Sequence, residues 1–262
     1  MTTSKQDSKS LSRQRYSRFA QNYVDSQEHA KGTDLDRLID IAQPQPNWAV
    51  LDVATGGGHT ALQFAPFVKT VLATDITPKM LEAAQRFISG QNVDNVSFKL
   101  ADAEDLPFAA GEFDLVTCRI APHHFPNCAS FVQSSASVLK TGGLLLVQDH
   151  VLPQNEPTAR YIDDFERLRD PSHNRAFSEQ EWIALFQAAG LEVVHTEQLV
   201  KEHNFLSWVE RQKCTPDVIE QLNQMILQAP AEVQAWLCPC HFGTPEATFI
   251  NHHILIAGQK VK

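Results

Sequence analysis

The chain has 262 residues, and 43% of them are hydrophobic, which is enough to bury the core of one α/β domain. Its formal net charge is −9, and its lysines and arginines are scattered, so no basic stripe suits a nucleic-acid backbone. No window approaches the roughly 18 apolar residues that span a bilayer, and the polar stretch 1–15 lacks the apolar core of a signal peptide. We therefore expect neither a nucleic-acid partner nor integral membrane association.

The five cysteines are too few and too unevenly spaced to form a disulfide framework in a chain of this length. A reducing, cytoplasmic compartment is therefore expected. Cys238, Cys240 and His241 suggest a metal site, but no second Cys/His cluster of matching spacing completes a tetrahedral set. We expect no bound metal.

The first 44 residues predict a helical cap. Residues 1–9 are polar and lack periodicity, so they are expected to be disordered. A helical pattern begins at Leu11, and a second one runs from Leu35 to Ile39 before Pro44 ends the cap.

An alternation of strands and helices follows the cap. The expected strands are 48–54, 70–75, 95–100, 113–119 and 143–149, and the expected helices are 59–66, 78–90 and 127–140. Apolar strands in this arrangement are buried in a mostly parallel sheet that helices cover on both faces. The pattern therefore predicts a doubly wound α/β fold.

Beyond residue 150 the pattern is less regular. We expect helices at 156–168 and 178–189, a sixth strand at 192–200, two helices within 205–237 and a seventh strand at 247–257. Additions to such folds cluster at the carboxyl edge of the sheet, so this helical insertion before the last strand should cover the substrate. The chain is then one domain, with a cap at 1–44, a cofactor-binding core at 45–150 and a substrate side at 151–262.

Acidic residues end three successive strands of the predicted sheet. Asp52 ends the first strand and precedes the glycine run 56–58, whose missing side chains let a ligand lie against the backbone. Asp75 and Asp102 end the next two apolar runs. The three carboxylates are therefore expected to form one edge of a pocket.

Two cofactors suit this edge. Gly56-x-Gly58-x-x-Ala61 fits the looser dinucleotide fingerprint, with Asp75 near the spacing of a ribose contact. Asp52, however, would lie close to the pyrophosphate of a nicotinamide cofactor and repel it. S-adenosylmethionine has no phosphate and offers an ammonium and a sulfonium instead. The sequence favours this cofactor, with an NAD(P)-dependent oxidoreductase or a non-catalytic cofactor-binding module as the alternatives.

Four sequence blocks carry a resemblance to a known family. They read LDVATGGG from Leu51, DITPKML from Asp75, ADAEDLPF from Ala101 and FDLVTCR from Phe113. In this order they resemble class I S-adenosylmethionine-dependent methyltransferases of the methyltransferase domain type 11 group, which is related to the ubiquinone and menaquinone C-methyltransferases. Ala54 stands where many members have their first glycine. The resemblance implies a Rossmann-like fold with a seven-stranded sheet.

The resemblance also implies roles at the cofactor edge. Asp75 would accept hydrogen bonds from both ribose hydroxyls, and Asp102 one from the adenine amine. The resemblance places Tyr23 and Lys31 in a lid. Arg119, just past the fourth strand, is expected to line the pocket floor through its backbone and to leave its guanidinium free for the substrate. The expected cofactor-binding residues are Tyr23, Lys31, Asp52, Ala54, Gly56, Gly58, Asp75, Ile76, Met80, Asp102, Ala103 and Arg119.

His123 and His124 follow the fourth strand, where the resemblance places residues that face the substrate. Methyl transfer requires the enzyme to orient the acceptor and remove its proton, and histidine titrates near working pH. We expect His123, and secondarily His124, to act as the base or to orient the acceptor. A structural role for the pair is the alternative.

Arg169, His173 and Arg175 form a polar cluster in a loop after the fifth strand. An arginine fork matches planar oxyanions, so the cluster is expected to bind a carboxylate or phenolate of the acceptor. A surface ion-pair network is the alternative. The expected partner is a small, hydrophobic or aromatic methyl acceptor, and the sequence leaves homodimer formation open.

Overall fold

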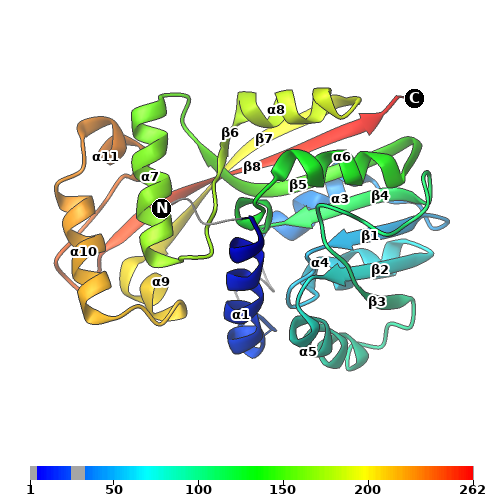
Figure 1. Cartoon of the computed structure of the whole chain (residues 1–262), viewed down its shortest axis with the longest axis horizontal. Coiled ribbons are helices and arrows are strands. Elements are labelled where there is room, and N and C mark those ends of the chain that lie inside the picture. The colour runs from blue at the N-terminus through cyan, green and yellow to red at the C-terminus, as the bar shows by residue number, and fades with distance from the viewer. Residues whose placement is uncertain (1–4, 25–32, 262) are drawn as a thin grey trace.

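The computed structural model describes residues 5–24 and 33–261 (Figure 1). Its sheet has the order β3-β2-β1-β4-β5-β8-β7, and a two-residue strand, β6 (Phe177–Ser178), pairs with β5 beside this path. The strands are β1 (Ala49–Val53), β2 (Thr70–Asp75), β3 (Val96–Leu100), β4 (Phe113–Arg119), β5 (Leu139–Leu152), β7 (Leu191–Asn204) and β8 (Thr248–Lys260). β8 runs antiparallel to both of its neighbours, and the remaining pairs are parallel. The prediction of a mostly parallel α/β sheet is confirmed.

Helices cover both faces of the sheet. They are α1 (Lys5–Val24), α3 (Thr33–Ala42), α4 (His59–Phe64), α5 (Pro78–Ser89), α6 (Cys128–Val138), α7 (Glu156–Arg169), α8 (Glu179–Ala188), α9 (Phe205–Arg211), α10 (Pro216–Leu227) and α11 (Ala231–Leu237). Figure 1 shows α7, α9, α10 and α11 gathered at one end of the sheet, and α5 beside β2 and β3 at the other. Two short 3₁₀ turns, η1 (Ala65–Phe67) and η2 (Pro122–His124), complete the elements described.

Consecutive strand residues alternate between two apolar clusters. Val116 and Leu145 pack in one cluster with residues of α6 and α8, whereas Leu115 and Leu146 pack in the other with residues of α3 and α4. This alternation follows from the two-residue period of a strand, which sends neighbouring side chains to opposite faces. Both faces of the sheet are therefore apolar and covered, as a doubly wound fold requires.

Local sequence signals begin and end several helices. Thr77 precedes α5 in an extended conformation, Pro78 takes its first position and Gly90 follows its last residue. Ser178 and Glu181 form a reciprocal capping box at the start of α8. These caps fix the two helices that follow β2 and β6.

The structure adds β6 to the seven expected strands and extends the fifth strand to Leu139–Leu152, and it corrects two further segments. Residues 205–237 form three helices, because Pro216 and Pro230 each begin a new one. The expected disorder of residues 1–9 is wrong from Lys5 onward, since α1 begins there and Lys9 forms ion pairs with Asp102 and Glu104. Both corrections concern segments around the site.

A third apolar cluster joins α7 to the helices of the insertion. Phe165 of α7 stacks on Trp208 of α9, with ring centroids 5.1 Å apart, and Phe249 of β8 packs edge-on against both rings. The insertion is thereby fixed to the sheet rather than attached only through its ends. Within 5–24 and 33–261, no helix is both long enough and apolar enough to cross a bilayer.

Candidate active site

A cavity of about 830 Å³ opens at the carboxyl edge of the parallel strands. Small-molecule sites commonly occupy about 300–1,000 Å³, so this cavity lies in the upper part of that range. Its glycine-loop half is lined by Asp52, Gly56, Asp75, Ile76, Met80, Asp102 and Ala103. Its insertion half is lined by Glu166, Arg169, His203, Trp208, Asn251 and His253. The side chains named for the glycine-loop half are acidic or apolar, whereas those named for the insertion half include arginine, histidine and tryptophan. His123 also lines the cavity.

The loop after β1 turns through left-handed backbone. Ala54, Gly56 and Gly58 have φ angles of 53°, 55° and 87°. Ala54 lines the cavity, and its conformation costs an L-residue roughly 1–2 kcal/mol. Gly58 does not line the cavity. A Cβ at that position would lie 2.9 Å from Cδ1 of Ile88, so Gly58 serves the close packing of α4 on α5 rather than ligand contact.

Asp52 is 1% exposed at the end of β1. Its Oδ2 accepts a hydrogen bond from the Thr55 hydroxyl at 2.6 Å, and its Oδ1 accepts one from the Thr117 hydroxyl at 2.8 Å. Burial raises the pKa of Asp52 to about 6, against the opposing effect of these hydroxyl donors. The carboxylate is therefore costly to keep ionised unless a cationic group approaches it.

Asp75 lies beside it at the end of β2. Its Oδ1 accepts from the Thr77 backbone N–H at 2.8 Å, and its Oδ2 accepts from the Gly56 backbone N–H at 3.2 Å. Burial raises the pKa of Asp75 to about 6. Each oxygen keeps acceptor capacity, because a carboxylate has about four lone-pair sites. Ile76 and Met80 line the cavity next to it.

Asp102 is joined to the first helix. Its Oδ2 lies 2.6 Å from Nζ of Lys9, and its Oδ1 accepts from the Glu104 backbone N–H at 3.0 Å. Lys9 also lies 2.7 Å from Oε2 of Glu104. Sequence reasoning missed Lys9, because a single lysine in a polar stretch gives no signal of a partner 93 positions away. Ala103 lines the same part of the cavity.

The structure does not describe the side chains of the two expected lid residues. Lys31 lies outside the described residues. Tyr23 belongs to α1, but its side chain also lies outside the described part of the chain. Their expected role stays a prediction.

Arg119 ends β4, and the structure corrects the expectation of a guanidinium free for the substrate. Its Nη2 lies 2.9 Å from Oδ2 of Asp34, and its Nε lies 3.1 Å from Oε1 of Gln148. Although burial opposes ionisation of Asp34, Arg119 and Lys201 hold its pKa well below the usual range. The guanidinium is committed to this ion pair, because it would otherwise be a buried uncompensated charge.

His123 is paired with a carboxylate that sequence reasoning missed. Its Nδ1 lies 2.5 Å from Oδ1 of Asp149, and its backbone N–H donates to Oδ2 of the same residue at 2.7 Å. Asp149 is fully buried near the end of β5, and β4 and β5 pair up to Arg119 and Gln148. The pairing register thus brings the residue after Gln148 to the turn that follows Arg119. No hydrogen bond to Nε2 of His123 is found within residues 5–24 and 33–261.

Residues 44–210 match the family model described as a methyltransferase domain. The chain belongs to the methyltransferase family. It is 35% identical to the "Uncharacterized methyltransferase YcgJ" of Bacillus subtilis (strain 168) over 223 residues, which are 85% of this chain and 88% of that protein. The crystal structure of a Bacillus halodurans C-125 protein superposes with a TM-score of 0.85 at 38% identity, covering 88% of this chain and all of the other.

A relative of the quinone type matches a shorter stretch of the methyltransferase. The "Ubiquinone/menaquinone biosynthesis C-methyltransferase UbiE" of Shewanella frigidimarina (strain NCIMB 400) is 32% identical over 129 residues, which are 48% of this chain and 51% of that protein. The family resemblance expected from the four sequence blocks is confirmed, and the oxidoreductase alternative is not favoured.

S-adenosylmethionine is the cofactor of this methyltransferase. The glycine-loop half fits it chemically. Asp52 and Asp75 are buried carboxylates that keep acceptor capacity, which suits a ligand with an ammonium group and a pair of hydroxyls. The glycine backbone beside them leaves room for the ligand to approach the main chain.

His124 is engaged at both ring nitrogens in the methyltransferase. Its Nδ1 donates to the Ser172 carbonyl at 3.0 Å, and its Nε2 lies 2.5 Å from the Tyr16 hydroxyl. Burial, together with the neighbouring His123, lowers the pKa of His124 to about 3. The ring is therefore neutral and accepts from Tyr16. It has no ring nitrogen left for an acceptor, which argues against the catalytic role expected for it.

The three residues expected to bind the acceptor do not all lie at the cavity. Arg169 and His173 line the cavity, and Nε2 of His173 lies 2.7 Å from Oδ1 of Asp163. Arg175 is not among the described residues that line it, which argues against its expected substrate role. Its half-exposed guanidinium pairs with Glu181 and lies over the ring of Phe177, 4.8 Å from the centroid.

The cysteines of the rejected metal motif do not line the cavity. Cys238 and Cys240 are both exposed free thiols. Across the part of the chain that the structure describes, no group of three or more histidine, cysteine or acidic side chains is arranged to hold a metal ion.

Proposed function

We propose that this methyltransferase transfers the methyl group of S-adenosylmethionine to a small, hydrophobic or aromatic metabolite, with His123 as the proton acceptor. The observation that carries the proposal is the pairing of His123 with Asp149 at the cavity. Nδ1 of His123 lies 2.5 Å from Oδ1 of Asp149, whereas Nε2 of His123 has no hydrogen-bond partner among the described residues.

S-adenosylmethionine supplies a methyl carbon that its sulfonium activates for in-line displacement. The residues of the glycine-loop half bind and orient it. Asp75 accepts hydroxyl hydrogen bonds with the lone pairs that Thr77 and Gly56 leave, and Asp102 accepts from an amine. Asp52 attracts the positive end of the ligand, which offsets the cost of its own burial.

Asp149 positions the base. Because its Oδ1 accepts the Nδ1 proton of His123, the neutral ring carries its lone pair on Nε2. When Nε2 takes a proton from the acceptor, the buried carboxylate of Asp149 stabilises the imidazolium that forms. The second hydrogen bond, from the His123 backbone to Oδ2, fixes the carboxylate itself.

Aromatic side chains supply the apolar walls that an aromatic acceptor needs. Phe125 lines the cavity beside His123 and His124, and Trp208 lines its insertion half. Trp208 is 1% exposed, so its ring is fixed by packing rather than free to rotate. A flat apolar acceptor can lie against Phe125, close to His123.

Incubation of the protein with a cell extract and isotopically labelled S-adenosylmethionine, followed by mass spectrometry, identifies the acceptor. With that acceptor, H123A should lower kcat about 10²–10⁴-fold, the range for loss of a general base. Affinity for S-adenosylhomocysteine, measured by isothermal titration, should be unchanged.

H195A is the matched control, since His195 of β7 lies outside the cavity and pairs with Glu197. D149N should lower kcat with a smaller change in KM, because it disturbs the tautomer of His123 rather than binding. Full turnover by H123A would refute the assigned base, and failure of the wild type to bind S-adenosylhomocysteine would refute the cofactor site.

A further inference from the structure

Arg169 is held rigidly at the wall of the insertion half. It is the last residue of α7, and its Nε donates to the Trp208 carbonyl at 3.1 Å. Its Cζ lies 4.2 Å from the centre of the Trp208 ring, so the guanidinium rests on the indole face. The side chain is 13% exposed and lines the cavity. The plane of the guanidinium is therefore set before any ligand arrives.

The two terminal amino groups of Arg169 make no hydrogen bond among the described residues, and Nη1 forms one long ion pair with Glu166. Oε2 of Glu166 lies 3.8 Å from Nη1. That separation exceeds the 2.7–3.2 Å of an N–H···O hydrogen bond. The guanidinium is thus held by its Nε, by the Trp208 ring and by a long ion pair, and its terminal amino groups keep their hydrogen-bond donors for a ligand in the cavity.

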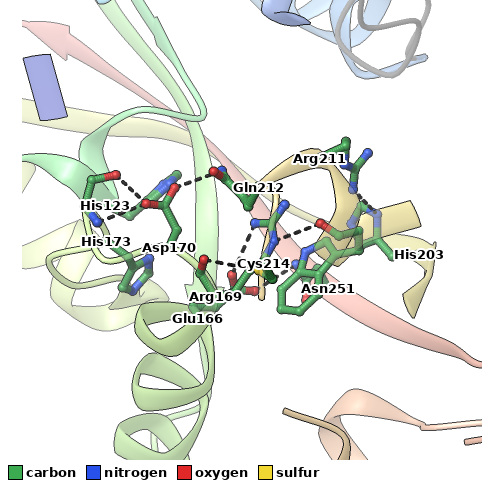
Figure 2. Close-up of polar contacts among 12 residues, drawn as sticks. His123, Glu166, Arg169, Asp170, His173, His203, Arg211, Gln212, Cys214 and Asn251 are labelled. Atoms are coloured by element: carbon green, nitrogen blue, oxygen red, sulfur yellow. Dashed lines mark hydrogen bonds and ion pairs between the residues drawn. The ribbon is translucent and has the colours of Figure 1, made fainter. Parts of the chain in front are cut away.

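Glu166 compensates the charge of Arg169 only weakly. Oε1 of Glu166 accepts a hydrogen bond from Nδ2 of Asn251 at 3.1 Å (Figure 2). The Glu166 side chain is buried. Burial raises the pKa of Glu166, which makes the carboxyl a poorer counter-ion. Asp170, the residue after Arg169, is itself paired with Arg15 at 3.0 Å.

An independent observation marks the same half of the cavity. His253 of β8 is 2% exposed and lines the cavity, and neither of its ring nitrogens has a hydrogen-bond partner in the described part of the chain. Burial, together with Lys201 and His203, lowers the pKa of His253 well below its usual value. The neutral ring offers one donor and one acceptor, and leaving such a group unsatisfied costs about 1–3 kcal/mol.

Arg211 and Lys201 also line the cavity, together with the carboxyl groups of Glu166, Asp170 and Glu202. Burial and the charges of Arg169 and Lys201 lower the pKa of His203 to about 4, so this imidazole is neutral as well. Nη2 of Arg211 lies 3.5 Å from Nδ1 of His203. Figure 2 shows Arg169, Arg211, His203 and Asn251, from α7, α9, β7 and β8, gathered around one region. Lys201 belongs to the ion pair with Asp34 described above.

We infer that the methyl acceptor carries a carboxylate, and that the insertion half binds this group through the terminal amino groups of Arg169. This inference rests on the proposed function and names its substrate class as small organic acids. The planar fork of an arginine matches the two oxygens of a carboxylate. His253 donates an N–H to the same anion or to an oxygen next to it. Trp208 holds the guanidinium in place, which reduces the entropy lost on binding.

Saturation-transfer NMR on the protein with S-adenosylhomocysteine tests this with matched probes. The probes are benzoate and 4-hydroxybenzoate, the corresponding benzamides, and phenyl phosphate. At least one acid should bind at least about tenfold more tightly than its amide, equivalent to about 1.4 kcal/mol. R169Q should remove this preference. R169K, which keeps the charge but not the fork, should retain part of it.

R160Q is the matched control, because Arg160 lies on the same helix and is exposed, with Glu156 as its partner. It should bind the acids like the wild type, and thermal melting checks that each variant folds. Equal binding of acids and amides, no binding by either acid, or an unchanged preference in R169Q would overturn the inference. Tighter binding of phenyl phosphate than of both acids would overturn it in favour of a phosphorylated acceptor.

Isothermal titration with S-adenosylhomocysteine separates the two proposals. If the wild type binds it and shows no preference for acids, the substrate class is wrong and the methyl-transfer proposal stands. If the wild type does not bind S-adenosylhomocysteine, the proposed function is wrong, and the inference about the acceptor falls with it.

Discussion

The burial of Asp52 makes a quantitative prediction about stability. Its pKa is 3.8 in an unperturbed carboxyl and about 6 in the folded protein. At about 1.36 kcal/mol per pKa unit, ionised Asp52 destabilises the cofactor-free fold by up to about 3 kcal/mol. The isosteric D52N removes this cost. We expect the variant to be the more stable protein at neutral pH.

The direction of the pH dependence of this stability difference follows from proton binding to Asp52. Because the pKa of Asp52 is higher in the folded protein than in the unfolded chain, the folded protein binds the proton more tightly. Protonation of Asp52 therefore contributes its full stabilisation of the fold below about pH 3.8, and this contribution is lost as pH rises through about 6. D52N mimics the protonated carboxyl at every pH. The stability difference between the two proteins should therefore be near zero at about pH 3.8 and reach its full size above about pH 6.

Urea denaturation of the cofactor-free proteins, followed by circular dichroism across this pH range, measures the difference. Because the two proteins differ at one position, the contributions of the other titrating groups, such as Asp34 and the buried histidines, cancel from the difference in their free energies of unfolding. A variant that is equally stable or less stable at about pH 8 contradicts the reasoning. The same variant should bind S-adenosylmethionine about 10–100-fold more weakly, because a hydrogen bond to a charged group contributes about 1.5–3 kcal/mol.

Three further predictions follow from the loop after β1 and from α1. A54G should stabilise the protein by up to about 1 kcal/mol in thermal melting, because relief of left-handed strain exceeds the added freedom of the unfolded chain. G58A should destabilise it by about 1–3 kcal/mol in urea, since its Cβ would meet Ile88 at 2.9 Å; unchanged stability would refute that packing role. K9A frees Asp102 and should tighten cofactor binding by at most about fivefold, because a partly exposed pair contributes about 0–1 kcal/mol; weaker binding would show that Lys9 assists the ligand.

Local patterns were sufficient for most of the fold. The helix that begins at Thr77 and Pro78 and ends at Gly90 was predicted because its signals lie within the segment itself. Residues 205–237 form three helices rather than the expected two, because Pro216 and Pro230 each begin a helix within one continuous amphipathic pattern. The three strand-end acids could be placed together because parallel strands end at one edge, and the structure puts Asp52, Asp75 and Asp102 around one cavity.

The side-chain pairs of the site could not be predicted in the same way. Asp149 meets His123 only through the register of β4 against β5, which no local pattern specifies. Arg169 and Arg175 look equivalent in one polar loop, yet the end of α7 directs one onto Trp208 and the other pairs with α8. Geometry across elements decided these cases, whereas residue type alone did not.

The antiparallel ribbon of β7 and β8 has a consequence for how this enzyme can change. Its paired residues run from Leu191 with Lys260 to Asn204 with Thr248, and the helices of the insertion connect the two strands beyond that end. The ribbon brings His203, Asn251 and His253 to the cavity, while the glycine loop depends on β1 and β2. Substitutions or length changes in 205–247 can therefore reshape what is methylated while the donor-binding machinery stays intact.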